Sequence, residues 1–146
     1  ATVESLEEGI RVSMRGRPHP IRLETGPYPE FPTDMQSVMM AAASVADGTS
    51  RIQENVFENR FCAAKELQKL GAHIIIENKL AVVDGVNALK GTRMAAEDLR
   101  GGAALAVAAL AADGTSFLDG YEHISRGYED IRSDLAGAGA RISLIG

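Results

Sequence analysis

The sequence predicts an α/β (α+β) domain built from repeated β-α-β-α-β units, and three observations support this prediction. The tetrapeptide Asp-Gly-Thr-Ser occurs at 47–50 and again at 113–116. Around both copies, short strand-like segments alternate with helix-like segments, which is the pattern of mixed α/β folds. The period near 66 residues is too long for a solenoid repeat, so we expect duplicated folding units inside one domain.

Other positions repeat at nearly the same offset. Arg60 matches Arg126 at an offset of 66, while Asp34 and Asp98 begin similar tripeptides at an offset of 64. A Leu-x-x-x-Gly-Ala motif occurs at 67–72 and at 135–140. Small insertions or deletions in loops account for the drift in the offset.

Each unit is expected to begin with a small apolar helix, at 35–46 in the first unit and at 99–112 in the second. Apolar residues on most faces predict that both helices are buried. Thr33, with Gln36 three residues later, and Asp98 are the predicted N-caps. The Asp-Gly pairs end the helices and turn the chain.

The later elements of each unit follow in the same order: a strand, a loop holding an arginine, an amphipathic helix and a returning strand. The expected strands are 50–54, 73–77, 81–86, 116–119 and 141–145, and the expected helices are 62–70 and 128–135. Ahead of the first unit, 10–14 and 21–24 are expected to pair as a hairpin. Residues 1–146 then form one domain, with a leading hairpin at 1–27, a first unit at 28–90 and a second unit at 91–146.

Composition limits the classes of function. The chain has 146 residues, enough for one domain with a core, and its net charge of −5 argues against a nucleic-acid-binding protein. The single Cys62 cannot form an internal disulfide, which favours a reducing compartment. The longest apolar run, 103–112, is too short to cross a bilayer, and the N-terminus has no signal-peptide pattern. These features predict a cytoplasmic chain without a membrane partner.

Five charged residues occupy positions that could meet at one side of the domain. Asp34 and Asp98 are at helix starts, Arg60 and Arg126 are in loops, and Arg100 is close to Asp98. Arginines can bind phosphate or carboxylate through two parallel hydrogen bonds, and an aspartate beside them can accept a proton from a hydroxyl. The set therefore predicts a site for an anionic, hydroxylated ligand. The competing interpretations are that the aspartates are only helix caps and that the arginines form surface ion pairs.

Four motifs at 31–36, 56–61, 97–100 and 126–129 resemble, in order and spacing, those of the UDP-N-acetylglucosamine enolpyruvyl transferases. Their strings are Phe-Pro-Thr-Asp-Met-Gln, Val-Phe-Glu-Asn-Arg-Phe, Glu-Asp-Leu-Arg and Arg-Gly-Tyr-Glu. Such enzymes transfer enolpyruvyl from phosphoenolpyruvate to a sugar 3-hydroxyl in peptidoglycan synthesis and cell wall biogenesis. The resemblance implies part of an enolpyruvyl-transferase-type domain, half of an inside-out α/β barrel. The sequence has no zinc motif, P-loop or dinucleotide fingerprint, so we expect no cofactor and no metal.

The resemblance also implies a role for each matching residue. Asp34 corresponds to the base that contacts the 3-hydroxyl, and Val56 to a segment that holds the amino sugar through its backbone. Arg126 corresponds to a phosphoenolpyruvate ligand. Asp98 and Arg100 match an acidic and basic pair near the reacting centre. Arg60 matches another active-site arginine, and whether Asp34 or Asp98 is the working base stays open.

The chain departs from the family pattern in two places and in length. Gly101-Gly102 replaces a common Ala-Ser, and Ser125 replaces a common Asp before Arg126. Family members are roughly three times longer, so the resemblance implies a truncated C-terminal part that lacks an N-terminal domain. We expect no turnover from this chain alone, and self-association through an exposed apolar flank is a hypothesis. The alternatives are a 5-enolpyruvylshikimate-3-phosphate synthase-like transferase and a non-catalytic ligand-binding or interaction module.

Overall fold

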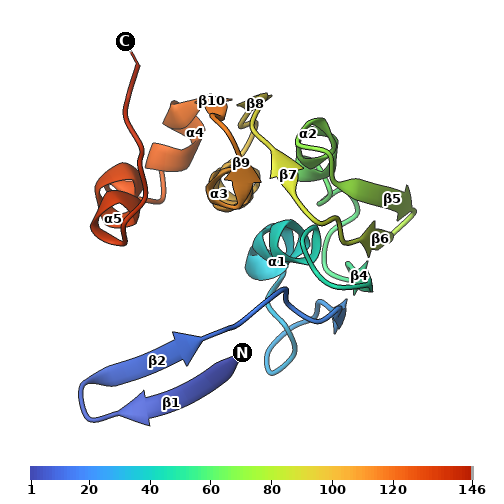
Figure 1. Cartoon of the computed structure of the whole chain (residues 1–146). Helices are drawn as coiled ribbons and strands as arrows, with labels where there is room; N and C mark the ends of the chain where they lie inside the picture. The colour runs from blue at the N-terminus through green and yellow to red at the C-terminus, as the bar shows by residue number, and fades with distance from the viewer. Residues whose placement is uncertain (146) are drawn as a thin grey trace.

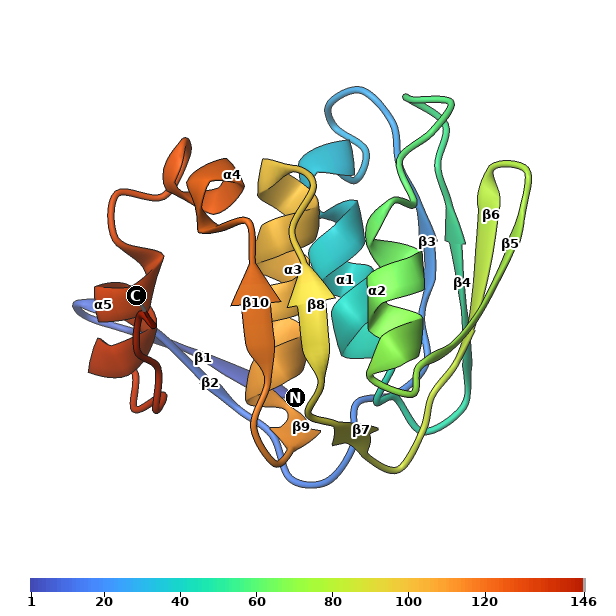
Figure 2. The same ribbon diagram turned by 90° about the horizontal axis from the view of Figure 1, so that it is seen from above.

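Three helices form the centre of the molecule and the strands lie outside them. The computed structural model describes residues 1–145. The helices are α1 (Gln36–Ala43), α2 (Ala63–Lys69) and α3 (Leu99–Leu110). Figure 1 looks nearly along α1 and α3, with the strands placed around them, and Figure 2 shows the three helices side by side. This arrangement confirms the α/β class and the expected burial of the first helix of each unit.

The main sheet has four strands in the order β3 (Arg22–Glu24), β4 (Thr49–Gln53), β6 (Leu80–Asp84) and β5 (His73–Glu77). β3 and β4 are parallel, and the other neighbours are antiparallel. Along β4 the buried residues alternate, because Ser50 and Ile52 face the core while their neighbours do not. The succession β3-α1-β4-α2-β5 is the predicted β-α-β-α-β order.

The second half of the chain begins with the same arrangement. β8 (Arg93–Ala95) is parallel to β10 (Phe117–Asp119), as β3 is to β4, and α3 lies between them in sequence. α4 (Tyr121–Ser125) and α5 (Ile131–Gly137) follow. A further parallel pair, β7 (Leu89–Lys90) with β9 (Ala112–Asp113), joins the two halves.

The predicted pairing of 10–14 with 21–24 is wrong. The leading hairpin consists of β1 (Thr2–Leu6) and β2 (Gly9–Ser13), while β3 belongs to the main sheet. The segment after β2 contains Pro18 and Pro20, which have no amide to donate to a ladder. Arg17 in the same segment donates to the carbonyl groups of Val45, Ala46 and Val86 and so ties it to the end of α1.

Of two predictions for the C-terminal segment, the helix is present but begins later than expected, and the strand is wrong. The helix expected at 128–135 begins at Ile131, because the Asp130 side chain accepts a hydrogen bond from Ser133 N and caps it. Residues 141–145 form no strand. A strand needs a neighbour, and none of the strands in residues 1–145 is placed to pair with this segment.

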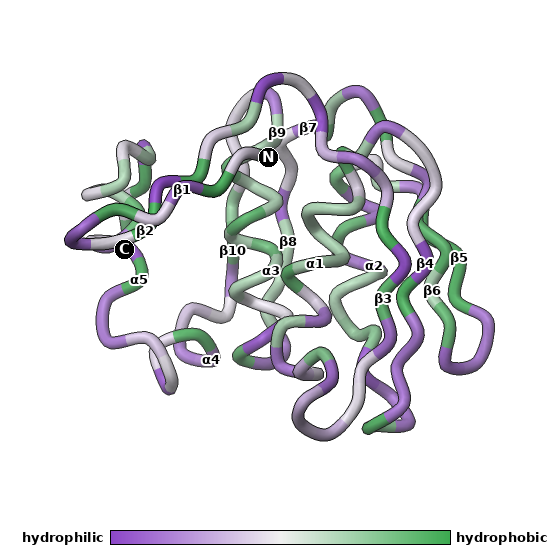
Figure 3. Tube along the Cα trace, turned by 90° about the horizontal axis from the view of Figure 1, so that it is seen from below, coloured by the Kyte–Doolittle hydropathy of each residue, from purple (hydrophilic) through white to green (hydrophobic). Residues whose placement is uncertain are grey.

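The core lies between the helices and the inner faces of the strands. Its largest fully buried apolar side chains include Met40, Ile52, Leu67 and Leu105. Seven residues of α3 between Gly101 and Ala108 are buried, and most of them are Ala or Gly, so small side chains allow α1 and α3 to pack closely. Figure 3 shows apolar colour along these helices and along β5 at the sheet edge. Within the described residues, every helix is too short or too polar to cross a membrane.

Candidate functional site

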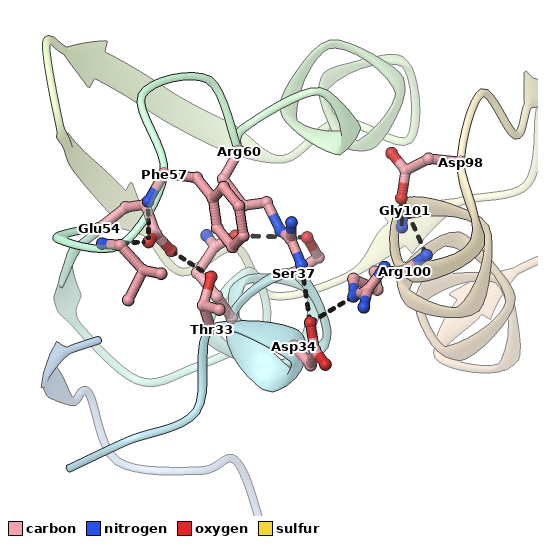
Figure 4. Close-up of polar contacts among 11 residues, drawn as sticks. Thr33, Asp34, Ser37, Glu54, Phe57, Arg60, Asp98, Arg100 and Gly101 are labelled. Atoms are coloured by element: carbon pink, nitrogen blue, oxygen red, sulfur yellow. Dashed lines mark hydrogen bonds and ion pairs between the residues drawn. The ribbon is translucent and has the colours of Figure 1, made fainter. Parts of the chain in front are cut away.

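Asp34 brings together three segments that are far apart in sequence. It lies in the 3-10 turn η1 (Thr33–Met35) that leads into α1. Its Oδ1 accepts a hydrogen bond from Arg60 Nη2 at 2.7 Å and another from Arg100 Nε (Figure 4). Arg60 comes from the loop after β4, and Arg100 from the first turn of α3. The predicted convergence of Asp34, Arg60 and Arg100 is therefore present.

The two arginines control the ionisation of Asp34. The hydrogen bond from Arg100 is the largest influence, and the charges of both arginines outweigh partial desolvation, so the pKa of Asp34 lies below its usual 3.8. The pKa of Arg100 is raised, chiefly by the same hydrogen bond. The lowered pKa keeps the carboxylate ionised, and because the Asp34 side chain remains 60% exposed, it is accessible to a ligand.

Arg60 is held from its other side by an aromatic ring. Its guanidinium carbon lies 4.4 Å from the centre of the Phe57 ring, a cation–π contact. The Arg60 side chain is only 18% exposed, whereas that of Arg100 is 40% exposed. Arg60 is thus the more fixed of the two cations, and Arg100 is the more accessible.

An open pocket of about 430 Å³ lies beside this cluster. Its lining residues come from the loop after β3, from η1 and from the segment after β4: Gly26, Pro27, Pro32, Thr33, Asp34, Asn55 and Val56. Asp34 and Val56, two of the predicted substrate-binding residues, therefore face the same pocket. The pocket wall is largely apolar, and Asp34 is the one charged residue among the described residues that line it.

Asp98 has a different environment. Its Oδ1 accepts hydrogen bonds from Arg100 N and Gly101 N, both at 2.8 Å, so it is the N-cap of α3 (Figure 4). The predicted cap is confirmed. Its carboxylate does not join Asp34. It fixes the backbone from which Arg100 projects, and its charge helps to raise the pKa of Arg100.

Arg126 lies close to the cluster but outside it. It is the exposed C-cap residue of α4, and the next residue, Gly127, packs against Leu99 at the start of α3. Within residues 1–145 the arginines that donate to Asp34 are Arg60 and Arg100, and Arg126 does not join them. The second unit therefore does not place Arg126 as the first unit places Arg60. Within the same residues, no group of His, Cys, Asp and Glu side chains is arranged to hold a metal ion.

Glu54 is a residue of the site that the sequence interpretation missed. Only 1% exposed, it accepts hydrogen bonds from Thr33 Oγ1 and Val56 N at 2.8 Å and from Phe57 N at 3.0 Å. The predicted Thr33 cap is consequently wrong, because that hydroxyl donates to Glu54 and no side chain caps η1. The alternation of β4 was the available signal: an acid two positions after Ile52 is expected to face inward.

Comparison with solved structures defines the class of protein. The enolpyruvyl transferase NikO from Streptomyces tendae matches 96% of this chain and 33% of its own, with a TM-score of 0.85 and 31% identity. An EPSP synthase from Acinetobacter baumannii matches 74% of the chain at a TM-score of 0.63 and 16% identity, which supports the fold alone. The helices inside and strands outside are thus the architecture of an enolpyruvyl transferase domain.

The chain belongs to the EPSP synthase (3-phosphoshikimate 1-carboxyvinyltransferase) family, whose model matches residues 1–135. A UDP-N-acetylglucosamine 1-carboxyvinyltransferase from Anaeromyxobacter sp. (strain Fw109-5) is 51% identical over 97% of this chain and 34% of that protein. One from Desulfofundulus thermocisternus is 52% identical over 93% of this chain and 56% of that protein. The chain therefore spans about a third of the length of the first relative and a little over half of the second.

Proposed function

We propose that this chain is part of a cytoplasmic enzyme that transfers enolpyruvyl from phosphoenolpyruvate to the 3-hydroxyl of UDP-N-acetylglucosamine, in peptidoglycan synthesis. The observation that carries the proposal is the ionised, accessible Asp34 held between Arg60 and Arg100 in the lining of the pocket. The names of relatives about 50% identical to the chain support the same reaction.

In this proposal Asp34 is the base. Its Oδ1 accepts hydrogen bonds from both arginines. Within residues 1–145 its Oδ2 has no hydrogen-bond partner and is available to the 3-hydroxyl. The sugar oxygen bonds to the central carbon of phosphoenolpyruvate, the carbon–oxygen bond to phosphate breaks, and the hydroxyl proton passes to the base. Asp98 is the weaker candidate, because its carboxylate caps α3.

The arginines would act on both reactants. An anionic group of phosphoenolpyruvate that binds Arg60 and Arg100 would compete with Asp34 for the same donors. As those hydrogen bonds to Asp34 weaken, its pKa would rise and the carboxylate would become a better proton acceptor. Arg126, exposed near the start of α3, is the proposed third cation of the phosphoenolpyruvate site.

The rest of the enzyme is the proposed partner of this chain. The apolar residues Val3, Ile10 and Val12 are 64–71% exposed on the leading hairpin and would pack against further polypeptide or against a second copy. Self-association of the isolated chain is the corresponding expectation. A monomeric mass by light scattering at high concentration counts against it.

A chimaera tests the proposed function. This chain replaces the matching third of the Anaeromyxobacter relative, and phosphate release is measured with phosphoenolpyruvate and either UDP-N-acetylglucosamine or shikimate 3-phosphate. We expect release with the amino sugar only, abolished by Asp34→Ala, and none from the isolated chain. Release with shikimate 3-phosphate instead would support the synthase-like alternative. A folded chimaera that is inactive with both acceptors would favour a non-catalytic module.

A further inference from the structure

Glu54 connects the two walls of the pocket through a single buried carboxylate. Oε2 accepts from Thr33 Oγ1, next to Asp34, and Oε1 accepts from the backbone amides of Val56 and Phe57. Thr33 and Val56 both line the pocket, on segments more than twenty residues apart in sequence. Figure 4 shows Glu54 between the η1 turn and the loop that carries Phe57.

The hydrogen bonds to Glu54 keep a charge inside the protein. Burial by itself raises the pKa of this carboxyl, but the donors from Phe57, Thr33 and Val56 and the Thr25 hydroxyl outweigh it and lower the pKa below 4.5. A buried carboxylate is tolerated only when its oxygens are satisfied in this way. Separating the two pocket walls would therefore remove donors that favour the ionised form.

We propose that Glu54 is a positioning residue for the amino-sugar site, which fixes the Thr33–Asp34 turn against residues 55–57. This inference rests on the proposed function. Both sides of Glu54 lead to Asp34. On one side Glu54 binds Thr33, the residue before Asp34. On the other side it binds the amide of Phe57; the Phe57 ring packs on Arg60, and Arg60 donates a hydrogen bond to Asp34. Without Glu54, the position of Asp34 relative to Val56 is no longer fixed by a shared hydrogen-bond acceptor.

Two substitutions of Glu54 separate the effect of its hydrogen bonds from the effect of its negative charge. In Glu54→Gln the amide oxygen can still accept from Val56 N and Phe57 N, and its NH₂ can donate to the Thr33 hydroxyl oxygen. The conservative variant thus keeps the connection without the charge. In Glu54→Ala the donors from Thr33, Val56 and Phe57 lose their acceptor, and the two walls are uncoupled.

Glu66 provides a matched control. Its Oε2 accepts from a backbone amide, Ala95 N, at 2.9 Å, and its other oxygen pairs with Lys69. It belongs to α2 and does not line the pocket beside Asp34. Glu66→Ala therefore removes a carboxylate that binds a backbone amide, but it leaves the proposed site intact.

The test is a titration of the ¹⁵N-labelled chain and its three variants with UDP-N-acetylglucosamine. We expect Glu54→Ala to weaken binding about tenfold or more, Glu54→Gln to stay within about threefold of the unmodified chain, and Glu66→Ala to leave binding unchanged. In ligand-free spectra, Glu54→Ala should move the amide signals of both Val56 and Asp34. If Glu54→Ala does not fold, Glu54→Asp, too short to reach both walls, replaces it with the same expected loss.

Three results would overturn the inference: unchanged binding in Glu54→Ala, an equal loss in Glu66→Ala, or no rescue by Glu54→Gln. If the unmodified chain does not bind the nucleotide sugar, the proposed function loses its support in this chain. The role of Glu54 is then decided by the ligand-free spectra alone. Signals that move only at residues 55–57 in Glu54→Ala, and not at Asp34, would contradict it.

Discussion

At the scale of single residues, Asp34 has the contacts expected of a residue that binds a ligand rather than of one that stabilises the fold. It accepts from two arginines but is mostly exposed, and exposed ion pairs contribute little to stability. The sequence identified Asp34, Arg60 and Arg100 because the repeat and the motifs marked them. It missed Glu54, whose importance depends on donors from another segment that only the folded chain brings together.

Asp34→Asn should therefore separate binding from stability. We expect the free energy of unfolding, measured by urea denaturation, to change by less than about 1 kcal/mol. Affinity for UDP-N-acetylglucosamine should fall about tenfold, because a charged acceptor is lost beside the pocket. Asp119→Asn, which breaks the exposed pair with Arg93, is the control and should leave affinity unchanged. A loss of several kcal/mol in Asp34→Asn would assign this residue a structural role.

The pH dependence of stability should report the charge of Glu54. Its pKa is lower in the folded chain than its ordinary 4.5, so its contribution is present above pH 4.5 and is lost as the pH falls through the folded value. The stability difference between the unmodified chain and Glu54→Gln should shrink on going from neutral pH to about pH 3. Urea denaturation at several pH values measures it, and a difference that stays constant would contradict an ionised Glu54.

At the scale of elements, α3 begins at the cap that the sequence predicted. Asp98 accepts from two backbone amides, and asparagine can replace it as an acceptor. Asp98→Ala should lower the free energy of unfolding by about 1 kcal/mol, and Asp98→Asn by only a few tenths. A large loss of affinity in Asp98→Asn, with stability retained, would instead make the Asp98 charge part of the site.

The glycine pair of α3 has a packing reason that the sequence did not reveal. A Cβ on Gly102 would lie 2.5 Å from Cγ1 of the buried Ile124, so the missing side chain allows α4 to pack on α3. Gly102→Ala should destabilise the chain by about 1–3 kcal/mol despite the better helix propensity of alanine. Gly137→Ala, in α5 with open space around it, is the control and should stabilise by up to about 1 kcal/mol. Thermal unfolding of both variants measures this, and a stabilised Gly102→Ala would show that Ile124 can move.

At the scale of the whole molecule, the duplicated order of elements was predictable because periodicity and capping are local signals. The helices α1, α2 and α3, the strand β5 and the β-α-β-α-β order of the first unit followed from them, whereas α4 was not predicted. The partner of β3 was not predictable, since parallel pairing with β4 is decided by tertiary packing around α1. The expected strand at 141–145 failed for a related reason: an apolar pattern becomes a strand only beside another strand.

If the proposed function is right, this chain carries a preformed half of the active site. The most direct measurement is amide chemical-shift mapping of the unmodified chain with UDP-N-acetylglucosamine, and separately with phosphoenolpyruvate. We expect shifts at Asp34 and Val56 with the nucleotide sugar, and at Arg60 and Arg100 with phosphoenolpyruvate. A folded chain that shows no shifts with either ligand up to millimolar concentration, or shifts elsewhere on the surface, would contradict it.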